Sequence, residues 1–180
     1  SDGEMSKIGY ATYAKERLTG FDVNAEVPDG GGLTIADLDD YPELAAKSLE
    51  GLETSTPVCV DDIQYTGADL LQLDLDNFDT AARGRSVEQR FMNAASPGVI
   101  ALYLPNKHYP TLDEYLFALA EAMRTEYEAI VNAGLTLQID APDLAGGRHI
   151  QYAHLSDDEF LQRVEVHVEA INHAVANIDP

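Results

Sequence analysis

The sequence predicts an α/β protein in which strands and helices alternate. Three segments, at residues 57–63, 98–104 and 135–140, have the apolar composition of buried strands, and a segment with helical spacing follows each of them. The joins are short, so neighbouring strands should be parallel, because antiparallel neighbours need no helix between them. We therefore expect the three strands to lie side by side, with Asp62 and Asp140 at one common edge.

The first third of the chain is its least regular part. Residues 10–18 have the composition of a short helix, and the stretch at about 20–56 is loop-rich, with glycine, proline and acidic residues close together. After the first strand we expect a helix over 67–82 and a second helix around 87–94.

Two later helices begin with a capping-box pattern. Thr111 and Glu114 mark the start of one, and Ser156 and Glu159 mark the start of the last. Gly134 stands where a residue in the left-handed conformation would end the first of them. Apolar residues at spacings of three and four predict one buried face on each helix, formed by Leu112, Leu116, Leu119, Met123, Tyr127 and Ile130 in the first and by Phe160, Val164, Val168, Ile171, Val175 and Ile178 in the second.

Composition limits the classes of protein to consider. The chain has 180 residues, 45% of them hydrophobic, which suits one domain with a core of its own. Its 32 acidic and 11 basic side chains give a net charge of -21, which repels nucleic acid and anionic membrane surfaces, so neither is an expected partner. The single cysteine, Cys59, excludes an intrachain disulfide, and the opening residues lack a signal core, so we expect a cytoplasmic protein.

Two motifs resemble one enzyme family. The segment YEAIVNAGLTLQIDAPDL, from Tyr127 to Leu144, is similar to the AGxxxIQxDEPAL pattern in the catalytic-domain barrel of cobalamin-independent methionine synthase. The opening SDGEM is similar to that family's strand-end Gly-Glu segment, and residues 95–130 also read like the family. The resemblance implies a (β/α)8 TIM-type barrel, of which residues 1–180 cover only part. We expect the rest of the barrel, or another subunit, to cover the open strand edges.

The resemblance also implies which residues bind the substrate. Asp140 matches an aspartate that contacts the substrate amino acid, and Glu4 matches a glutamate that holds the amino group of homocysteine. From the pattern alone two alternatives stay open, in which Asp140 caps the turn before Pro142 and Glu4 is a solvated terminal residue. Ala141 stands where the family pattern has glutamate, which argues against methionine synthesis in particular.

Other polar residues lie at the ends of predicted strands. Asp61 and Asp62 end the first strand, and we interpret the pair as solvated, with cation binding as the alternative. His108 follows the second strand and is a further candidate, able to donate to a carboxylate or phosphate, with a plain surface histidine as the alternative. Ser96 and Pro97 precede that strand and have the pattern of a turn.

The family uses zinc to convert the substrate thiol into a thiolate, so the resemblance implies a zinc cofactor. Such a site needs three ligands from histidine, cysteine and glutamate. Here Cys59 has no partner cysteine, and His167 and His173 are six positions apart, which places them on different faces of one helix. We therefore expect no metal site within this chain and zinc ligands beyond Pro180.

The sequence thus predicts a methyltransferase-like protein that transfers a methyl or alkyl group to or from a small-molecule thiol. One alternative is a lyase, transferase or decarboxylase of the same barrel superfamily. Another is a non-catalytic, acidic binding or scaffold subunit that kept the fold, and Ala141 together with the missing zinc ligands favours it.

Overall fold

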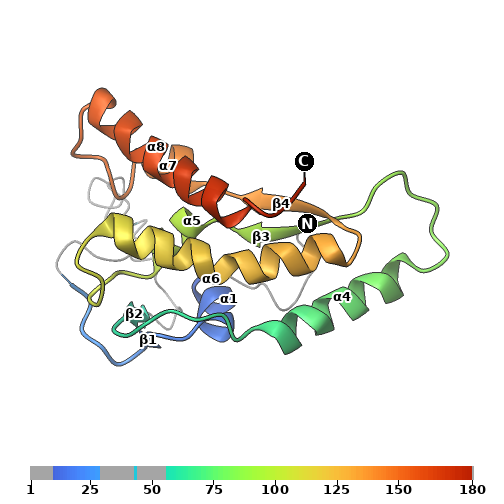
Figure 1. The fold of residues 1–180 in the computed structure, drawn as a ribbon. Coiled ribbons are helices and arrows are strands. Elements are labelled where there is room, and N and C mark those ends of the chain that lie inside the picture. The colour runs from blue at the N-terminus through green and yellow to red at the C-terminus, as the bar shows by residue number, and fades with distance from the viewer. Residues whose placement is uncertain (1–9, 29–42, 44–55, 180) are drawn as a thin grey trace.

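A computed structural model of the protein describes residues 10–28, 43 and 56–179. The described residues form six helices and two small sheets of two strands each (Figure 1). The expected (β/α)8 barrel, and with it the expected part of a barrel, is therefore wrong. The sheets contradict it. One sheet is an antiparallel pair, β1 (Phe21–Asp22) with β2 (Val58–Cys59). The other is a separate parallel pair, β3 (Phe91–Ala95) with β4 (Thr136–Asp140).

The strand expected at 57–63 is reduced to the two residues of β2. Its partner β1 runs antiparallel to it, and β2 belongs to a different sheet from β4. Asp62 and Asp140 therefore do not share the edge of one sheet. The third predicted strand is confirmed, because β4 occupies nearly all of 135–140.

The strand expected at 98–104 is instead a helix, α5 (Pro97–Tyr103). Ser96 is its N-cap, and the Ser96 hydroxyl accepts a hydrogen bond from the Val99 amide at 3.0 Å. Proline suits the first helical turn, where its missing N–H is not needed. Six of the seven residues of α5 are buried, so the sequence shows a continuous apolar run, and periodicity cannot distinguish such a helix from a buried strand.

The opposite error occurs just before α5, where β3 replaces the helix expected around residues 87–94. β3 pairs with β4 along its whole length, with Ala95 opposite Asp140, and its residues Met92, Ala94 and Ala95 are buried. The connection from β3 to β4 passes through α5 and α6 (Leu112–Asn132). A long crossover of this kind is what two parallel strands require.

The central helix of the core is α6. It contacts α5, α8, β3 and β4 (Figure 1). The face predicted from apolar spacing is buried at Leu116, Leu119, Met123, Tyr127 and Ile130. Although α6 is 21 residues long, neither it nor any other helix in the described part of the chain is apolar enough to cross a membrane.

Local signals for the helix ends are confirmed. The Thr111 hydroxyl accepts a hydrogen bond from the Glu114 amide, and the Glu114 carboxylate accepts one from the Thr111 amide, both at 3.1 Å. Ser156 and Glu159 form the same reciprocal pair at the start of α8. Gly134 has a φ of 80°, so the left-handed residue after α6 is present.

The last helix, α8 (Asp157–Ala174), packs against α6 and α5. Its buried residues are His167, Ala170 and Ala174, whereas Val168 from the predicted apolar stripe is 39% exposed. Small residues and a histidine therefore form the buried face, which allows α8 to lie close to α6.

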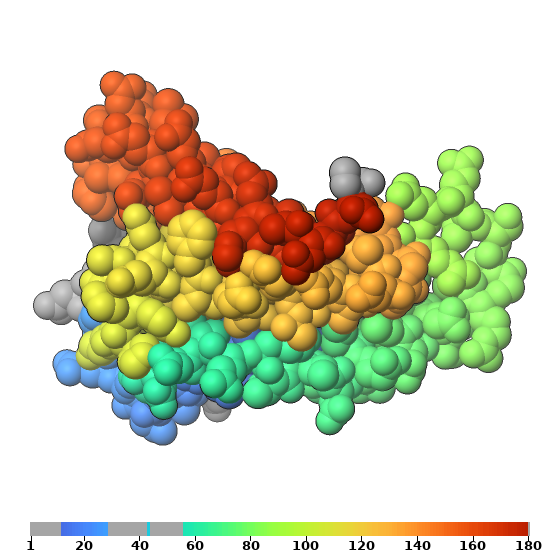
Figure 2. Space-filling model, viewed as in Figure 1, coloured from blue at the N-terminus to red at the C-terminus, as the bar shows by residue number. Residues whose placement is uncertain are grey.

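Helix α4 (Ala68–Ala82) forms where the sequence predicts it, but only Leu71 and Asp74 on it are buried. Its far end and the loop 83–90 stand out from the rest of the molecule (Figure 2). The remaining helices are α1 (Tyr10–Arg17) and the short α7 (Asp143–Gly146), which follows β4.

Candidate functional site

Asp140 lies at the carboxyl end of β4, which is where the sequence places it. The residue is partly buried, and its backbone carbonyl accepts a hydrogen bond from the Ser96 amide at 3.0 Å. Ser96 comes directly after β3, so the carboxyl ends of the two parallel strands are joined at this edge. Ligands of α/β proteins bind at this end of parallel strands. Glu4, the second predicted substrate contact, lies outside the described residues.

Four buried polar side chains lie beside this edge, and we call them the polar chain. The Ser96 hydroxyl donates to Asp143 Oδ1 at 2.6 Å, and Asp143 Oδ2 lies 2.7 Å from His167 Nδ1. The other ring nitrogen of His167 lies 3.0 Å from the Tyr152 hydroxyl. None of the four residues is more than 5% exposed. The polar chain therefore connects the end of β3 with α7 and α8.

The order of groups in the polar chain excludes a hydrolytic triad. The Asp143 carboxylate lies between the hydroxyl of Ser96 and the imidazole of His167, so the imidazole cannot take the serine proton, as nucleophilic catalysis requires. Burial raises the pKa of Tyr152 to about 12, which keeps its hydroxyl protonated at neutral pH. We conclude that the polar chain positions helices and does not supply a nucleophile.

Gly98 allows α5 to approach the polar chain closely. A Cβ atom at this position would lie 2.7 Å from Asp143 Cγ and would also overlap Asp143 Oδ2 and His167 Nδ1. Any larger residue would therefore push α5 away from α7 and α8. The glycine is required here for space.

A second buried polar group, the charged cluster, joins α1, α4 and α6. Arg17 Nη2 lies 2.6 Å from Asp74 Oδ2, and Arg17 Nε lies 3.4 Å from Glu126 Oε2. The Tyr65 hydroxyl donates to Glu126 at 2.7 Å, and the Tyr13 hydroxyl donates to the other oxygen of the same carboxylate. The Arg17 guanidinium also lies over the Tyr13 ring, 4.5 Å from its centre.

The charged cluster is almost completely shielded from water. Arg17 and Glu126 are 0% exposed and Asp74 is 3% exposed, and Arg17 Nη1 makes no hydrogen bond in the structure. Burial, followed by the nearby Glu126 charge, raises the pKa of both Tyr13 and Tyr65, so both phenols stay protonated as donors. The cluster attaches α1 and α4 to the central helix.

A third group lies on the surface, where Asp61, Asp62 and His108 come together. One ligand atom from each residue lies within 4.8 Å of the other two, and His108 Nε2 is 2.9 Å from Asp62 Oδ1. His108 thus faces a carboxylate, one of the roles that the sequence left open for it. The structure brings His108 to the pair Asp61 and Asp62, which the sequence analysis treated separately from it, and the pair follows β2, which belongs to a different sheet from β4.

The described residues do not fit the zinc site that the resemblance implies. Cys59 is buried, its thiol donates to the Asp61 carbonyl at 3.5 Å, and burial raises the pKa of the thiol to about 11. Zinc binds the thiolate, which such a thiol does not form at neutral pH. Both nitrogens of His167 already have partners, and His173 pairs with Glu121 on an exposed face. No cysteine and histidine set converges among residues 10–28, 43 and 56–179.

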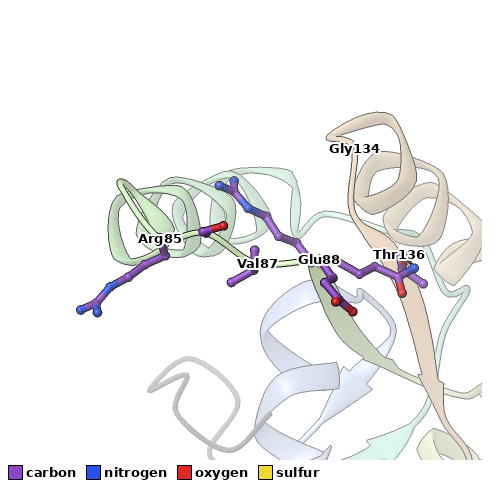
Figure 3. Close-up of a pocket in the computed structure, with 8 residues that line it drawn as sticks. Arg85, Val87, Glu88, Gly134 and Thr136 are labelled. Carbon is purple, nitrogen blue, oxygen red and sulfur yellow. Dashed lines mark hydrogen bonds between the residues drawn. The ribbon is translucent and has the colours of Figure 1, made fainter.

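Two hollows lie at the opposite, amino-terminal end of the β3–β4 pair. The larger, of about 410 Å³, is lined by residues 85–90 with Gly134 and Thr136, and the smaller, of about 280 Å³, shares Arg90 with it. Figure 3 shows that the Arg85 side chain points away from Glu88 and Thr136. Polar groups of both hollows already bond to one another, Gln89 to Thr136 at 2.7 Å in the larger and Arg90 to Asp79 at 3.4 Å in the smaller, and we assign no ligand to either hollow.

The sequence analysis missed the polar chain and the charged cluster. Ser96 has the pattern of a turn, and its cap on α5 appears only once the helix is known. The available signal was a polar residue within a buried helical face, namely Glu126 beside Met123 and Tyr127 and His167 three residues before Ala170.

Comparisons with known proteins give no relative. No protein-family model, no curated protein and no solved structure matches the chain.

Proposed function

We propose that this chain binds a small thiol-bearing amino acid and takes part in transferring a methyl or alkyl group to or from the sulfur. The observation that carries the proposal is Asp140, which ends a parallel strand in the segment that resembles the methionine-synthase pattern. A carboxylate at this edge suits the ammonium group of an amino acid, because a charge-assisted hydrogen bond is short and strong.

In this proposal the chain's own residues bind and orient the substrate. Asp140 holds the amino group, and the polar chain beside it fixes α7 and α8, so that the edge keeps one shape when the substrate arrives. The described residues supply no thiolate and no set of cysteine and histidine ligands of the kind that the resemblance implies, so the proposal assigns them no step of the transfer itself. A buried thiol that stays protonated also suits a cytoplasmic location, where disulfides are rare.

The experiment is a calorimetric titration of the full chain with homocysteine. Asp140→Asn should weaken binding roughly ten- to a hundredfold, because hydrogen bonds to charged groups contribute about 1.5–3 kcal/mol. Glu88→Gln is the matched control, since it also removes one carboxylate but lies before β3, at the other end of the strand pair. It should leave the affinity unchanged.

Either of two results overturns the proposal: wild-type protein that does not bind homocysteine, or an Asp140→Asn variant that binds it as tightly as wild type. A non-catalytic thiol-binding subunit is the second candidate, because Ala141 stands where the family pattern has glutamate. Binding that depends on Asp140, without alkyl transfer when zinc and a methyl donor are added, favours this second candidate.

A further inference from the structure

Asp61, Asp62 and His108 form the one group of three or more metal-ligating side chains found among the residues that the structure describes. The group combines two carboxylates with an imidazole, so it is more than a patch of acidic residues. We propose that these three residues bind one divalent transition-metal ion, at a site separate from Asp140. The inference uses none of the residues on which the proposed function rests.

The distances suit a shared ion. All three ligand atoms lie within 4.8 Å of one another, and His108 Nε2 and Asp62 Oδ1 are already 2.9 Å apart. Metal ligands of this kind lie about 2.0–2.2 Å from zinc, so two ligands of one ion stand about 3–4 Å apart. Small rotations of the three side chains are therefore enough to bring them around one centre.

The backbone holds the two loops together before any ion binds. The Cys59 amide donates to the Pro105 carbonyl at 2.8 Å, and the Lys107 amide donates to the Cys59 carbonyl at 2.9 Å. On the far side of the carboxylates, the Ile63 amide donates to the Tyr109 hydroxyl at 3.0 Å. The segment that carries Asp61 and Asp62 is therefore fixed at both ends to the segment that carries His108.

The His108 loop has its own internal support. The Asn106 side-chain oxygen accepts hydrogen bonds from the amides of His108 and Tyr109, at 3.0 and 2.9 Å. The His108 ring packs edge-on against the Tyr109 ring, with 4.9 Å between their centres. A ligand whose backbone and ring are both held loses less freedom when it binds an ion.

The donor types indicate the class of metal. Imidazole suits zinc, copper, iron and nickel, whereas calcium prefers six to eight oxygen ligands and magnesium keeps most of its water. Two oxygens and one nitrogen leave at least one coordination position for water or for a small ligand. The net charge of the whole chain, -21, also favours a cation.

The test is a titration of the full chain, stripped of metal with a chelator, with Zn²⁺ and in parallel with Ca²⁺. We expect one Zn²⁺ per chain and weaker binding of Ca²⁺. Asp62→Asn and His108→Gln should each weaken Zn²⁺ binding by at least about tenfold, because even the loss of an outer-shell partner costs this much. An unchanged urea-unfolding midpoint shows that each variant is folded.

His173→Gln provides the matched control. His173 Nε2 lies 2.8 Å from Glu121 Oε2 on the surface, and the Arg124 guanidinium contacts both groups. Among the described residues this pair belongs to no group of three metal-ligating side chains. This variant should bind Zn²⁺ as wild type does. A His108→Gln variant with full affinity, or Ca²⁺ binding as tight as Zn²⁺ binding, overturns the site and indicates a general effect of negative charge.

A second measurement needs no variant. Mn²⁺ added to the wild-type chain broadens the NMR signals of nuclei near its binding site. Broadening of the His108 ring signals before those of His173 supports the proposal, and the reverse order contradicts it.

Discussion

The charged cluster and the polar chain are both buried, and both attach helices to the core, but their hydrogen bonding differs. In the polar chain, each of Ser96, Asp143, His167 and Tyr152 contacts the next at 2.6 to 3.0 Å. In the charged cluster, one arginine faces two carboxylates, and its Nη1 atom has no hydrogen-bond partner in the structure.

This difference indicates what each cluster is sensitive to. Removing one member of a buried ion pair leaves a charge without its partner in a medium that solvates it poorly, so the charged cluster should be sensitive to changes of charge. The polar chain has most of its hydrogen-bonding atoms matched and lies against a glycine, so it should be sensitive to changes of volume. Three predictions test this distinction.

The largest expected effect is that of Arg17→Met, which keeps much of the apolar stem but removes the charge. Asp74 and Glu126 then remain buried without their cation, and we expect the free energy of unfolding to fall by about 3–5 kcal/mol. Urea denaturation followed by circular dichroism measures the loss. Lys15→Met on the exposed side of the same helix is the control and should change stability little. A loss for Arg17→Met as small as that for Lys15→Met would show that the cluster contributes no net stability.

A smaller effect is expected for Gly98→Ala, which adds one methyl group against the polar chain. The new Cβ would overlap Asp143 and His167, and forcing an extra carbon into a packed core typically costs about 1–3 kcal/mol. Gly146→Ala is the matched control, because a Cβ at that position in α7 meets no atom within 4 Å. Equal stabilities of the two variants in urea would contradict the claim that space is limiting at Gly98.

The third expected effect appears only in alkali, as a loss of stability that both clusters share. Unfolded tyrosine has a pKa of about 10. Burial raises the folded-state pKa of Tyr13 and Tyr65 in the charged cluster, and that of Tyr152 in the polar chain to about 12. Above pH about 10 the unfolded chain therefore loses tyrosine protons that the folded chain keeps, so stability should fall as pH rises. The Cys59 thiol, whose pKa burial raises to about 11, adds a loss that begins near its unfolded pKa of about 8.5.

Urea midpoints between about pH 8 and 11 measure this slope, and Tyr152→Phe should make it shallower. Midpoints that rise with pH would contradict the raised pKa values. Full tyrosinate absorbance in the native protein at the alkaline end of the range would contradict them as well.

The sequence predicts correctly those elements whose signals are local. The capping boxes at Thr111 and Ser156 and the left-handed Gly134 each depend on hydrogen bonds or backbone angles within a few residues. The segments 87–94 and 98–104 were assigned wrongly because their structure depends on what covers them. α5 is buried on all sides, and β3 exists through its pairing with the distant β4.

The candidate site follows the same rule. The position of Asp140 at a strand end is predicted correctly, because the apolar segment before it indicates a strand from local residues alone. The charged cluster is not predictable in this way, because Tyr13 and Glu126 are 113 positions apart and meet only in the folded chain. His108 and Asp62 are likewise 46 positions apart, so the sequence shows two unrelated polar residues where the structure shows a pair.

Cys59 gives this protein an internal reporter of local opening. Its side chain is 0% exposed between β1 and the 105–107 segment, and its thiol is protonated at neutral pH, so a thiol-specific reagent cannot modify it in the closed state. The rate of modification therefore measures how often this part of the molecule opens, as hydrogen exchange does for amides. Because Asp61 and Asp62 lie only two and three residues after Cys59, an ion that holds them to His108 would slow the same rate, and one kinetic trace would report local unfolding and metal binding together.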